Sequence, residues 1–173
     1  MIDADRPTSL LFVCMGNICR SPLAEGLFIH LARERAVLDR FRVDSCGTGA
    51  WHVGELPDPR MRSTAEKHGV TLTSRARQID PATDFPDLTN KGGFDLILPM
   101  DRDNMAAVLD LGAPPERVRL FRSFDPALRD RPKRDLDVPD PYYGGDEGFE
   151  RVFEMVWAAC NGLLDHLDGA ERG

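Results

Sequence analysis

Hydrophobic residues along the chain fall into four short runs, each followed by a more polar stretch. The runs cover Ser9–Val13, Phe41–Ser45, Phe94–Leu98 and Arg117–Phe121. Short apolar runs of this kind, bounded by turn residues, are typical of strands that are buried in a parallel sheet. We therefore predict four strands at these positions.

Helical spacing of apolar residues follows the predicted strands. After the first strand, Leu23, Leu27 and Leu31 recur at intervals of four residues. Ser21 followed by Pro22 predicts an N-cap and a proline at the first helical position. Further helices are predicted over about 58–69, 105–111 and 146–167. Strands that alternate with helices indicate an α/β fold with a parallel sheet.

Two segments of the chain look irregular. Asp80–Gly93 mixes proline, aspartate, threonine and glycine, and predicts a surface excursion. Pro126–Tyr143 predicts a long loop, and it holds a basic cluster, Arg129–Arg134, among acidic neighbours. That cluster either steers an acidic peptide toward the loop that holds Asp140 or forms an ordinary solvated face.

Composition narrows the class of protein. The 173 residues include 22 Lys and Arg against 29 Asp and Glu, for a net charge of −7, which argues against nucleic-acid binding. No apolar run approaches the roughly 20 residues that span a bilayer. The first residues lack the basic start of a signal peptide, and four cysteines are too few for a disulfide scaffold. We expect a single-domain cytoplasmic protein, spanning residues 1–173, that binds neither membrane nor nucleic acid.

The informative motif is Cys14-x5-Arg20-Ser21, at the junction of the first strand and its helix. Backbone N–H groups in such a loop, with the helix dipole behind them, bind a tetrahedral oxyanion. Arg20 supplies a planar fork for two phosphate oxygens, while Gly16 and Asn17 allow the backbone angles of a curled loop. The same field favours an ionised thiolate, so we expect Cys14 to be a nucleophile.

Two other kinds of site are not supported by the sequence. The chain has no G-x-x-x-x-G-K-[ST] motif, so the loop is not a nucleotide-binding P-loop. The histidines are scattered, without the spacing of metal ligands. They are His30, His52, His68 and His166. We therefore expect no metal and no cofactor.

At two places the sequence resembles the low-molecular-weight protein tyrosine phosphatases. Val13–Pro22 resembles the phosphate-binding loop of that family, and Asp140–Gly144, which reads Asp-Pro-Tyr-Tyr-Gly, resembles its general-acid loop. The likeness extends over essentially the whole chain. It implies a three-layer sandwich in which helices flank a four-stranded parallel sheet of strand order 2-1-3-4. It also implies phosphotyrosine-containing proteins as substrates, and a monomer or weak dimer.

The resemblance also implies a role for each matching residue. Cys14 would attack phosphorus to give a thiophosphate intermediate, and Asp140 would protonate the departing phenolate and later activate water. Arg20 and the loop amides would stabilise the equatorial oxygens. The loop residues concerned are Met15, Gly16, Asn17, Ile18 and Cys19.

Supporting roles are implied for several other positions. Ser21 would stabilise the thiolate as leaving group, Asn17 and Ser45 would brace the loop, and Asp101 would orient Arg20 or the loop. Ser74 stands where some relatives have a histidine in the network around Asn17, so the details of that network are open.

Aromatic residues match positions that line the family's cleft. They are Trp51, Tyr142 and Tyr143. Such rings suit a flat phosphorylated ring, through stacking contacts worth roughly 0.5–1.5 kcal/mol per pair. The alternatives are an exposed loop residue for Trp51 and surface packing for Tyr143.

The cysteines fall into two groups. In the family, Cys19 is associated with a reversible disulfide to Cys14, although a small buried thiol is the alternative. Cys46 and Cys160 are expected to be inert.

Three other functions compete with the tyrosine phosphatase. Arsenate reductases share Cys-x5-Arg but use closely spaced additional cysteines, and here Cys46 and Cys160 lie far apart. Protein arginine phosphatases carry threonine where this chain has Ile18. A phosphoprotein-binding module or redox sensor without turnover would have lost Cys14, Arg20 or Asp140. The sequence favours phosphotyrosine.

Overall fold

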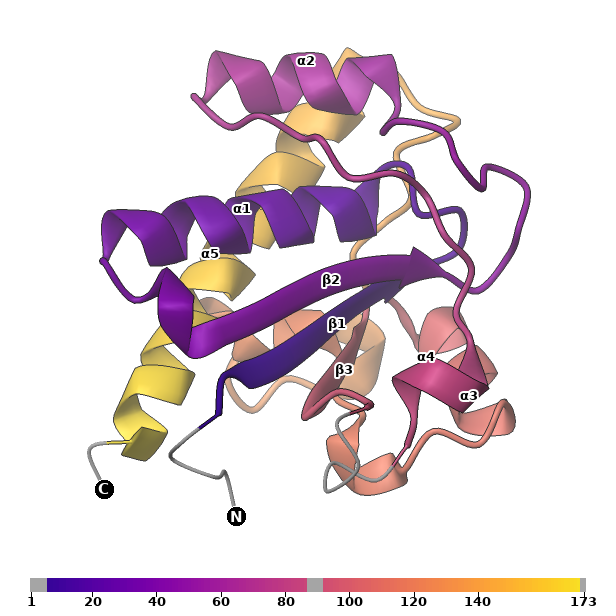
Figure 1. The fold of residues 1–173 in the computed structure, drawn as a ribbon. Coiled ribbons are helices and arrows are strands. Elements are labelled where there is room, and N and C mark those ends of the chain that lie inside the picture. The colour runs from indigo at the N-terminus through magenta and orange to yellow at the C-terminus, as the bar shows by residue number, and fades with distance from the viewer. Residues whose placement is uncertain (1–5, 87–91, 172–173) are drawn as a thin grey trace.

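A parallel sheet of three strands forms the centre of the computed structural model, which describes residues 6–86 and 92–171 (Figure 1). The strands are β1 (Thr8–Cys14), β2 (Phe41–Gly47) and β3 (Leu96–Pro99), in the order β2-β1-β3. Thr8 is paired with Phe41 and Cys14 with Gly47, so β1 and β2 end at the same edge. The predicted parallel α/β fold is confirmed, and the first three positions of the predicted strand order are correct.

The predicted fourth strand is wrong within these described residues. Pro115–Arg117 forms a 3-10 turn and Phe121–Phe124 forms another, so only a short extended piece lies between them. Val118 makes one parallel bridge to Ile97, and the Arg119 N–H donates to the Ile97 carbonyl at 3.0 Å. The segment therefore lies beside β3, where the fourth strand was expected, but it is too short to form a ladder. Proline, which restricts φ and lacks an N–H donor, favours the turn that shortens it.

Helices cover both faces of the sheet, which gives three layers (Figure 1). On one face lie α1 (Arg20–Glu34) and the long α5 (Asp146–Glu171), with α2 (Pro59–Lys67) packed against α5. On the other face lies α4 (Arg102–Asp110), with the four-residue α3 (Pro81–Asp84) nearby. No helix in the described part of the chain is long and apolar enough to cross a membrane.

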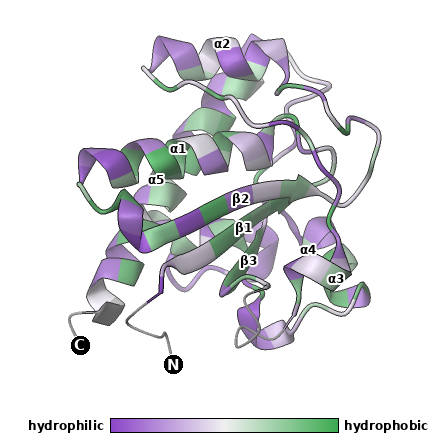
Figure 2. Cartoon of the chain, viewed as in Figure 1, coloured by the Kyte–Doolittle hydropathy of each residue, from purple (hydrophilic) through white to green (hydrophobic). Residues whose placement is uncertain are grey.

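Strand β1 is buried on both faces, as its continuous apolar pattern predicts. Leu10 and Phe12 belong to the larger core cluster, beneath α1 and α5. Leu11 and Val13 belong to the smaller cluster, beneath α4. Figure 2 shows the hydrophobic colouring of this central strand. Cys14 is therefore the last residue of a strand that is held in place by both core clusters.

The predicted helix starts met different outcomes. The helix predicted from about residue 58 forms as α2, and Asp58 caps it, with its Oδ1 accepting from the Arg60 N–H at 2.8 Å. The N-cap predicted at Ser21 is wrong, because α1 begins at Arg20 with Cys19 as its cap residue. The Ser21 hydroxyl instead contacts the sulfur of Cys14, so it is not available to cap the helix.

The two segments predicted to be irregular differ in what the structure describes. Residues 126–143 contain only short 3-10 turns, at Pro126–Leu128 and Lys133–Asp135, as expected for a long loop. In the segment Asp80–Gly93, α3 occupies the first part, while residues 87–91 lie outside the described residues.

Candidate active site

Residues 14–19 curl between the end of β1 and the first turn of α1. Asn17 has a φ of 57°, in the left-handed region that asparagine tolerates better than most residues. Gly47, at the end of β2, lets the loop approach, because a Cβ there would lie 2.7 Å from the Met15 carbonyl oxygen. The carbonyls of Cys14 and Met15 accept from the N–H groups of Thr48 and Gly49, at 2.9 and 3.0 Å. Neighbouring backbone thus satisfies carbonyls of the loop.

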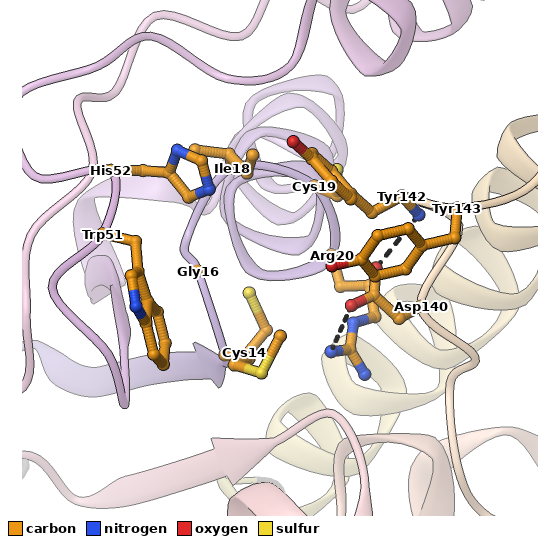
Figure 3. A pocket seen from close by; sticks show the side chains of 11 residues that line it. Cys14, Gly16, Ile18, Cys19, Arg20, Trp51, His52, Asp140, Tyr142 and Tyr143 are labelled. Atoms are coloured by element: carbon orange, nitrogen blue, oxygen red, sulfur yellow. Dashed lines mark hydrogen bonds and ion pairs between the residues drawn. The ribbon is translucent and has the colours of Figure 1, made fainter.

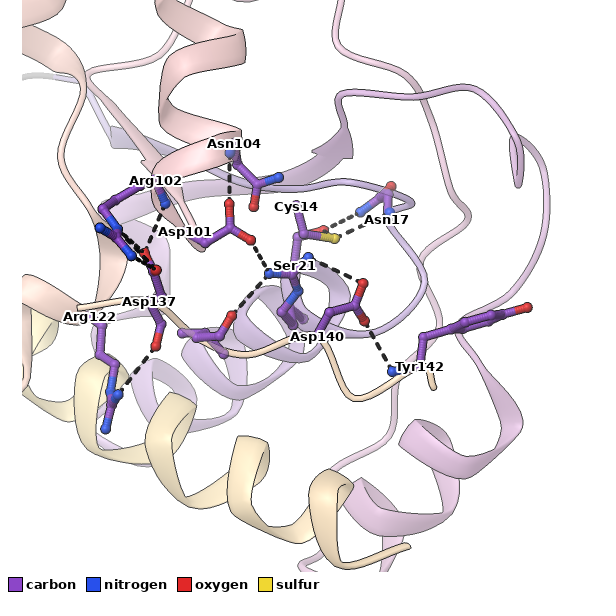
Figure 4. A network of polar contacts seen from close by, with 12 residues as sticks. Cys14, Asn17, Ser21, Asp101, Arg102, Asn104, Arg122, Asp137, Asp140 and Tyr142 are labelled. Atoms are coloured by element: carbon purple, nitrogen blue, oxygen red, sulfur yellow. Dashed lines mark hydrogen bonds and ion pairs between the residues drawn. The ribbon is translucent and has the colours of Figure 1, made fainter. Parts of the chain in front are cut away.

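A buried hydrogen-bond network surrounds the Cys14 sulfur (Figure 4). The Asn17 N–H donates to Sγ at 3.3 Å, and Ser21 Oγ lies 3.0 Å from it. The Asn17 side-chain amide donates to Ser21 Oγ at 2.8 Å and to Ser45 Oγ at 2.9 Å. The Arg77 N–H donates to Asn17 Oδ1 at 3.0 Å, which fixes the orientation of this amide. Since Ser21 Oγ accepts from Asn17, its own proton can be directed at the sulfur.

The guanidinium of Arg20 is almost completely buried, with 3% of its side chain exposed. Its Nη1 donates to Asp101 Oδ2 at 2.5 Å and to the Val138 carbonyl at 3.0 Å. Burial lowers the pKa of Arg20, but the negative charges of Cys14, Asp101 and Asp140 more than offset it, so the net shift is upward. The side chain is therefore a fixed cation at the bottom of the site.

Asp101 serves two elements at once. One of its oxygens accepts from Arg20, and the other accepts from the Asn104 N–H at 2.7 Å, as the N-cap of α4. Its place at the end of β3 brings it to the same sheet edge as Cys14. Of the two roles suggested for Asp101, to orient Arg20 or the loop, the structure shows the contact with Arg20.

Asp140 lies in the loop opposite the curled segment and is much more accessible, with 32% of its side chain exposed. Its Oδ2 lies 3.6 Å from Nη2 of Arg20, and its Oδ1 accepts from the Tyr142 N–H at 3.1 Å. Figure 3 shows the carboxylate beside Arg20, across the cavity from Trp51. The nucleophile candidate, the cation and the acid candidate thus face one space.

That space is a cavity of about 410 Å³. Its walls come from the curled loop, the segment after β2 and the loop that carries Asp140. The lining residues are Cys14, Met15, Gly16, Ile18, Cys19, Arg20, Trp51, His52, Asp140, Tyr142 and Tyr143. Of the residues singled out in the sequence, Asn17, Ser21 and Ser45 lie behind this wall as buried supports.

Aromatic side chains form the outer rim of the cavity (Figure 3). Trp51 is 72% exposed and Tyr143 is 88% exposed, while Tyr142 stands edge-on to Tyr143 with ring centroids 4.9 Å apart. Exposed rings around a concave site offer surfaces on which a flat ligand can stack.

Two residues of the site were not found from the sequence. His52 lines the cavity, with Nδ1 2.8 Å from Glu55 Oε2, and a Cβ at Gly16 would lie 3.1 Å from its ring. Glu25 is buried and accepts from Ser45 Oγ at 2.6 Å, which connects it to the network of Cys14. Burial raises the pKa of Glu25, and the hydrogen bond from Ser45 opposes that rise. No motif in the sequence singled out Glu25.

All four cysteines are buried, and none of them forms a disulfide. Burial raises the pKa of Cys19, as do the charges of Asp58 and Cys14, so this thiol stays protonated at neutral pH. Burial likewise raises the pKa of Cys46 and of Cys160. Among the described residues, no three His, Cys, Asp or Glu side chains are grouped so as to hold a metal ion.

Comparison with known proteins gives a consistent family. Residues 9–172 match the model of the family described as low molecular weight phosphotyrosine protein phosphatase. A low molecular weight protein-tyrosine-phosphatase of Streptomyces coelicolor is 46% identical over 157 residues, which cover 88% of this chain and 89% of that protein. Low molecular weight protein-tyrosine phosphatase A of Mycobacterium tuberculosis is 41% identical over 162 residues, which cover 94% of this chain and 93% of the relative.

The fold agrees with these relatives. The crystal structure of a protein tyrosine phosphatase from Entamoeba histolytica has a TM-score of 0.81 and 34% sequence identity, and the match covers 95% of this chain and 99% of the other. A match of this extent, with the family model over nearly the whole chain, shows common descent rather than a shared architecture alone. The chain belongs to the low molecular weight phosphotyrosine protein phosphatase family.

Proposed function

We propose that this protein hydrolyses phosphotyrosine in proteins, through a covalent phosphate on Cys14. The observation that carries the proposal is the meeting of three groups at one cavity. The Cys14 sulfur, the buried Arg20 guanidinium and the Asp140 carboxylate all line it, with the two charged groups 3.6 Å apart. This is the set of nucleophile, oxyanion clamp and proton donor that the cleavage of a phosphate monoester requires.

In the first step, the Cys14 thiolate attacks phosphorus and the bond from phosphorus to the phenolic oxygen breaks. Protonated Asp140 gives its proton to the departing phenolate, which leaves as the neutral phenol. Arg20 and the amides of residues 15–20 hold the equatorial oxygens while charge moves across them. Because Asp101 and the Val138 carbonyl already orient Arg20, the clamp needs little rearrangement when the phosphate arrives.

In the second step, the Asp140 carboxylate takes a proton from a water molecule, whose oxygen attacks phosphorus. The bond from phosphorus to sulfur breaks, the thiolate leaves with its electron pair, and inorganic phosphate departs. The Ser21 hydroxyl, 3.0 Å from Sγ, stabilises this leaving thiolate. The Asn17 amide keeps that hydroxyl in place.

The cavity also favours an aromatic phosphate over other phosphorylated side chains. Trp51 on one side and Tyr142 on the other offer ring faces to a phenyl ring that follows its phosphate inward. Ile18 adds an apolar contact to the wall. These three side chains carry no charge, so this part of the wall offers no ionic partner to the guanidinium of a phosphoarginine.

A peptide assay tests the proposal. Phosphotyrosine, phosphoserine and phosphoarginine versions of one peptide are compared, with Cys14→Ser as the control. We expect release of phosphate from the phosphotyrosine peptide alone, no turnover by Cys14→Ser, and retained vanadate binding by that variant. Wild-type turnover by Cys14→Ser would refute the nucleophile, and a preference for phosphoarginine would refute the substrate.

A further inference from the structure

Arg60, near the start of α2, touches three parts of the structure around the candidate acid. It donates to both oxygens of Asp58, from Nε to Oδ1 at 3.0 Å and from Nη2 to Oδ2 at 2.8 Å. Nη2 also donates to the Tyr142 carbonyl at 3.1 Å. Its guanidinium lies over the Tyr142 ring, 5.5 Å from the centroid, and over the Phe149 ring of α5, 4.7 Å from the centroid.

The Tyr142 backbone connects Arg60 to Asp140. The N–H of Tyr142 donates to Asp140 Oδ1, and its carbonyl accepts from Arg60. Arg60 thus holds the same residue whose N–H fixes one oxygen of the acid, while Arg20 lies near the other oxygen at 3.6 Å. Because Asp140 is partly exposed, these few contacts decide where its carboxylate points.

Asp58 connects the other end of Arg60 to the loop of the nucleophile. Its side chain is buried and caps α2, and its own N–H donates to the Ile18 carbonyl at 2.8 Å. The hydrogen bonds from Arg60 lower the pKa of Asp58 despite its burial, so the carboxylate stays charged. A continuous chain of contacts therefore runs from Ile18 through Asp58, Arg60 and Tyr142 to Asp140.

We propose that Arg60 is a positioning residue, which holds the Tyr142 peptide so that Asp140 reaches the oxygen of the leaving phenolate. The proposal rests on the function proposed above, in which Asp140 is the proton donor. Arg60 is not among the residues that line the cavity, so it acts only through the loop. Its loss should therefore matter when a substrate needs a proton, and hardly at all when the leaving group is already stable.

The experiment measures kcat/KM for two aryl phosphates, phenyl phosphate with a poor leaving group and 2,4-dinitrophenyl phosphate with a good one. This parameter covers the first chemical step, whereas kcat can report the second. Arg60→Met, which keeps an apolar stem without a donor, should lose about tenfold with phenyl phosphate and less than twofold with the other substrate. Arg60→Lys keeps the charge but loses the planar fork by which Arg60 binds both oxygens of Asp58. We therefore expect a smaller loss with the same preference.

Arg62→Met is the matched control, because Arg62 lies on the same helix and its Nε donates to the Pro57 carbonyl at 3.0 Å. It should lower kcat/KM only slightly, and by the same factor for both substrates. Asp140→Ala is measured in parallel. If it shows a leaving-group preference and Arg60→Met does not, the role of Arg60 is refuted while the acid stands. If Asp140→Ala loses kcat/KM equally for the two substrates, Asp140 is not the proton donor, and the proposed role of Arg60 is refuted with it.

Discussion

The curled loop, residues 14–19 with Arg20 and Ser21 at the start of α1, faces the acid loop, residues 140–143, across the cavity. The two loops are held very differently. The curled loop continues a strand buried in two core clusters, and its polar side chains are buried and bonded to one another. The acid loop follows a long irregular segment and keeps Asp140 in position through Tyr142, Arg20 and the support of Arg60. We infer that the nucleophile side is rigid before substrate binds, whereas the acid side can adapt.

Replacing Arg20 should have the largest effect on the rigid side. Arg20→Lys keeps a positive charge but cannot bind Asp101, the Val138 carbonyl and two phosphate oxygens together. We expect kcat/KM to fall by about 10²–10³-fold, equally for good and poor leaving groups, because the clamp acts on the phosphoryl group in either case. Arg102→Lys, at an exposed pair with Asp137, is the control and should change little. A loss confined to poor leaving groups would contradict this division of roles.

Replacing the acid should give a smaller and more selective loss. Asp140→Ala removes the proton donor while leaving the buried network of Cys14 intact. We expect kcat/KM for phenyl phosphate to fall by about 10²-fold, with a much smaller change for 2,4-dinitrophenyl phosphate. A series of aryl phosphates that vary in leaving-group basicity measures the difference as a steeper slope than in the wild type.

Asn17 tests whether the rigid side contributes to folding as well as to catalysis. Asn17→Ala removes the bonds to Ser21, Ser45 and the Arg77 N–H, and we expect a loss of about 2–4 kcal/mol in the free energy of unfolding. Asn17→Gly loses the same bonds but tolerates the φ of 57°, so it should be more stable than Asn17→Ala by about 1 kcal/mol. Urea titration of both variants measures the free energy of unfolding, and so separates the lost hydrogen bonds from the backbone strain at residue 17. Equal stability of the two variants would show that this strain contributes nothing.

The smallest expected effect is at the aromatic rim. Trp51→Ala should weaken kcat/KM for aryl phosphates by about three- to tenfold, from the loss of one stacking contact. It should leave kcat/KM for an alkyl phosphate unchanged. Trp157→Ala, on α5 and stacked on Phe153, is the control for loss of a partly exposed tryptophan and should not alter the ratio of aryl to alkyl rates.

The sequence predicted the fold where one local signal dominates and missed it where signals compete. Apolar runs located β1, β2 and β3, but the same kind of run around Val118 forms a single bridge because turns on either side shorten it. Ser21 looked like an N-cap because a serine before proline usually is one. Here its hydroxyl belongs to the network of Cys14, a contact that depends on the loop's conformation and not on spacing.

The candidate site shows the same limit. The curled loop and Asp140 carry recognisable motifs, and the structure brings them to one cavity. Glu25 and Arg60 carry none, because a glutamate within a helix and an arginine in the first turn of a helix are common on solvated surfaces. Only the folded chain reveals that Glu25 is buried against Ser45 and that Arg60 reaches the Tyr142 carbonyl.

The shared carboxylate of Asp101 has a consequence for motion outside the cavity. Because one oxygen orders the first turn of α4 and the other orders Arg20, an oxyanion seated on Arg20 should also damp the fraying of that helix. Hydrogen exchange at the Asn104 amide would then slow when tungstate occupies the cavity. Binding of an anion in the cavity would thus be detectable as reduced exchange in α4, on the other face of the sheet from α1.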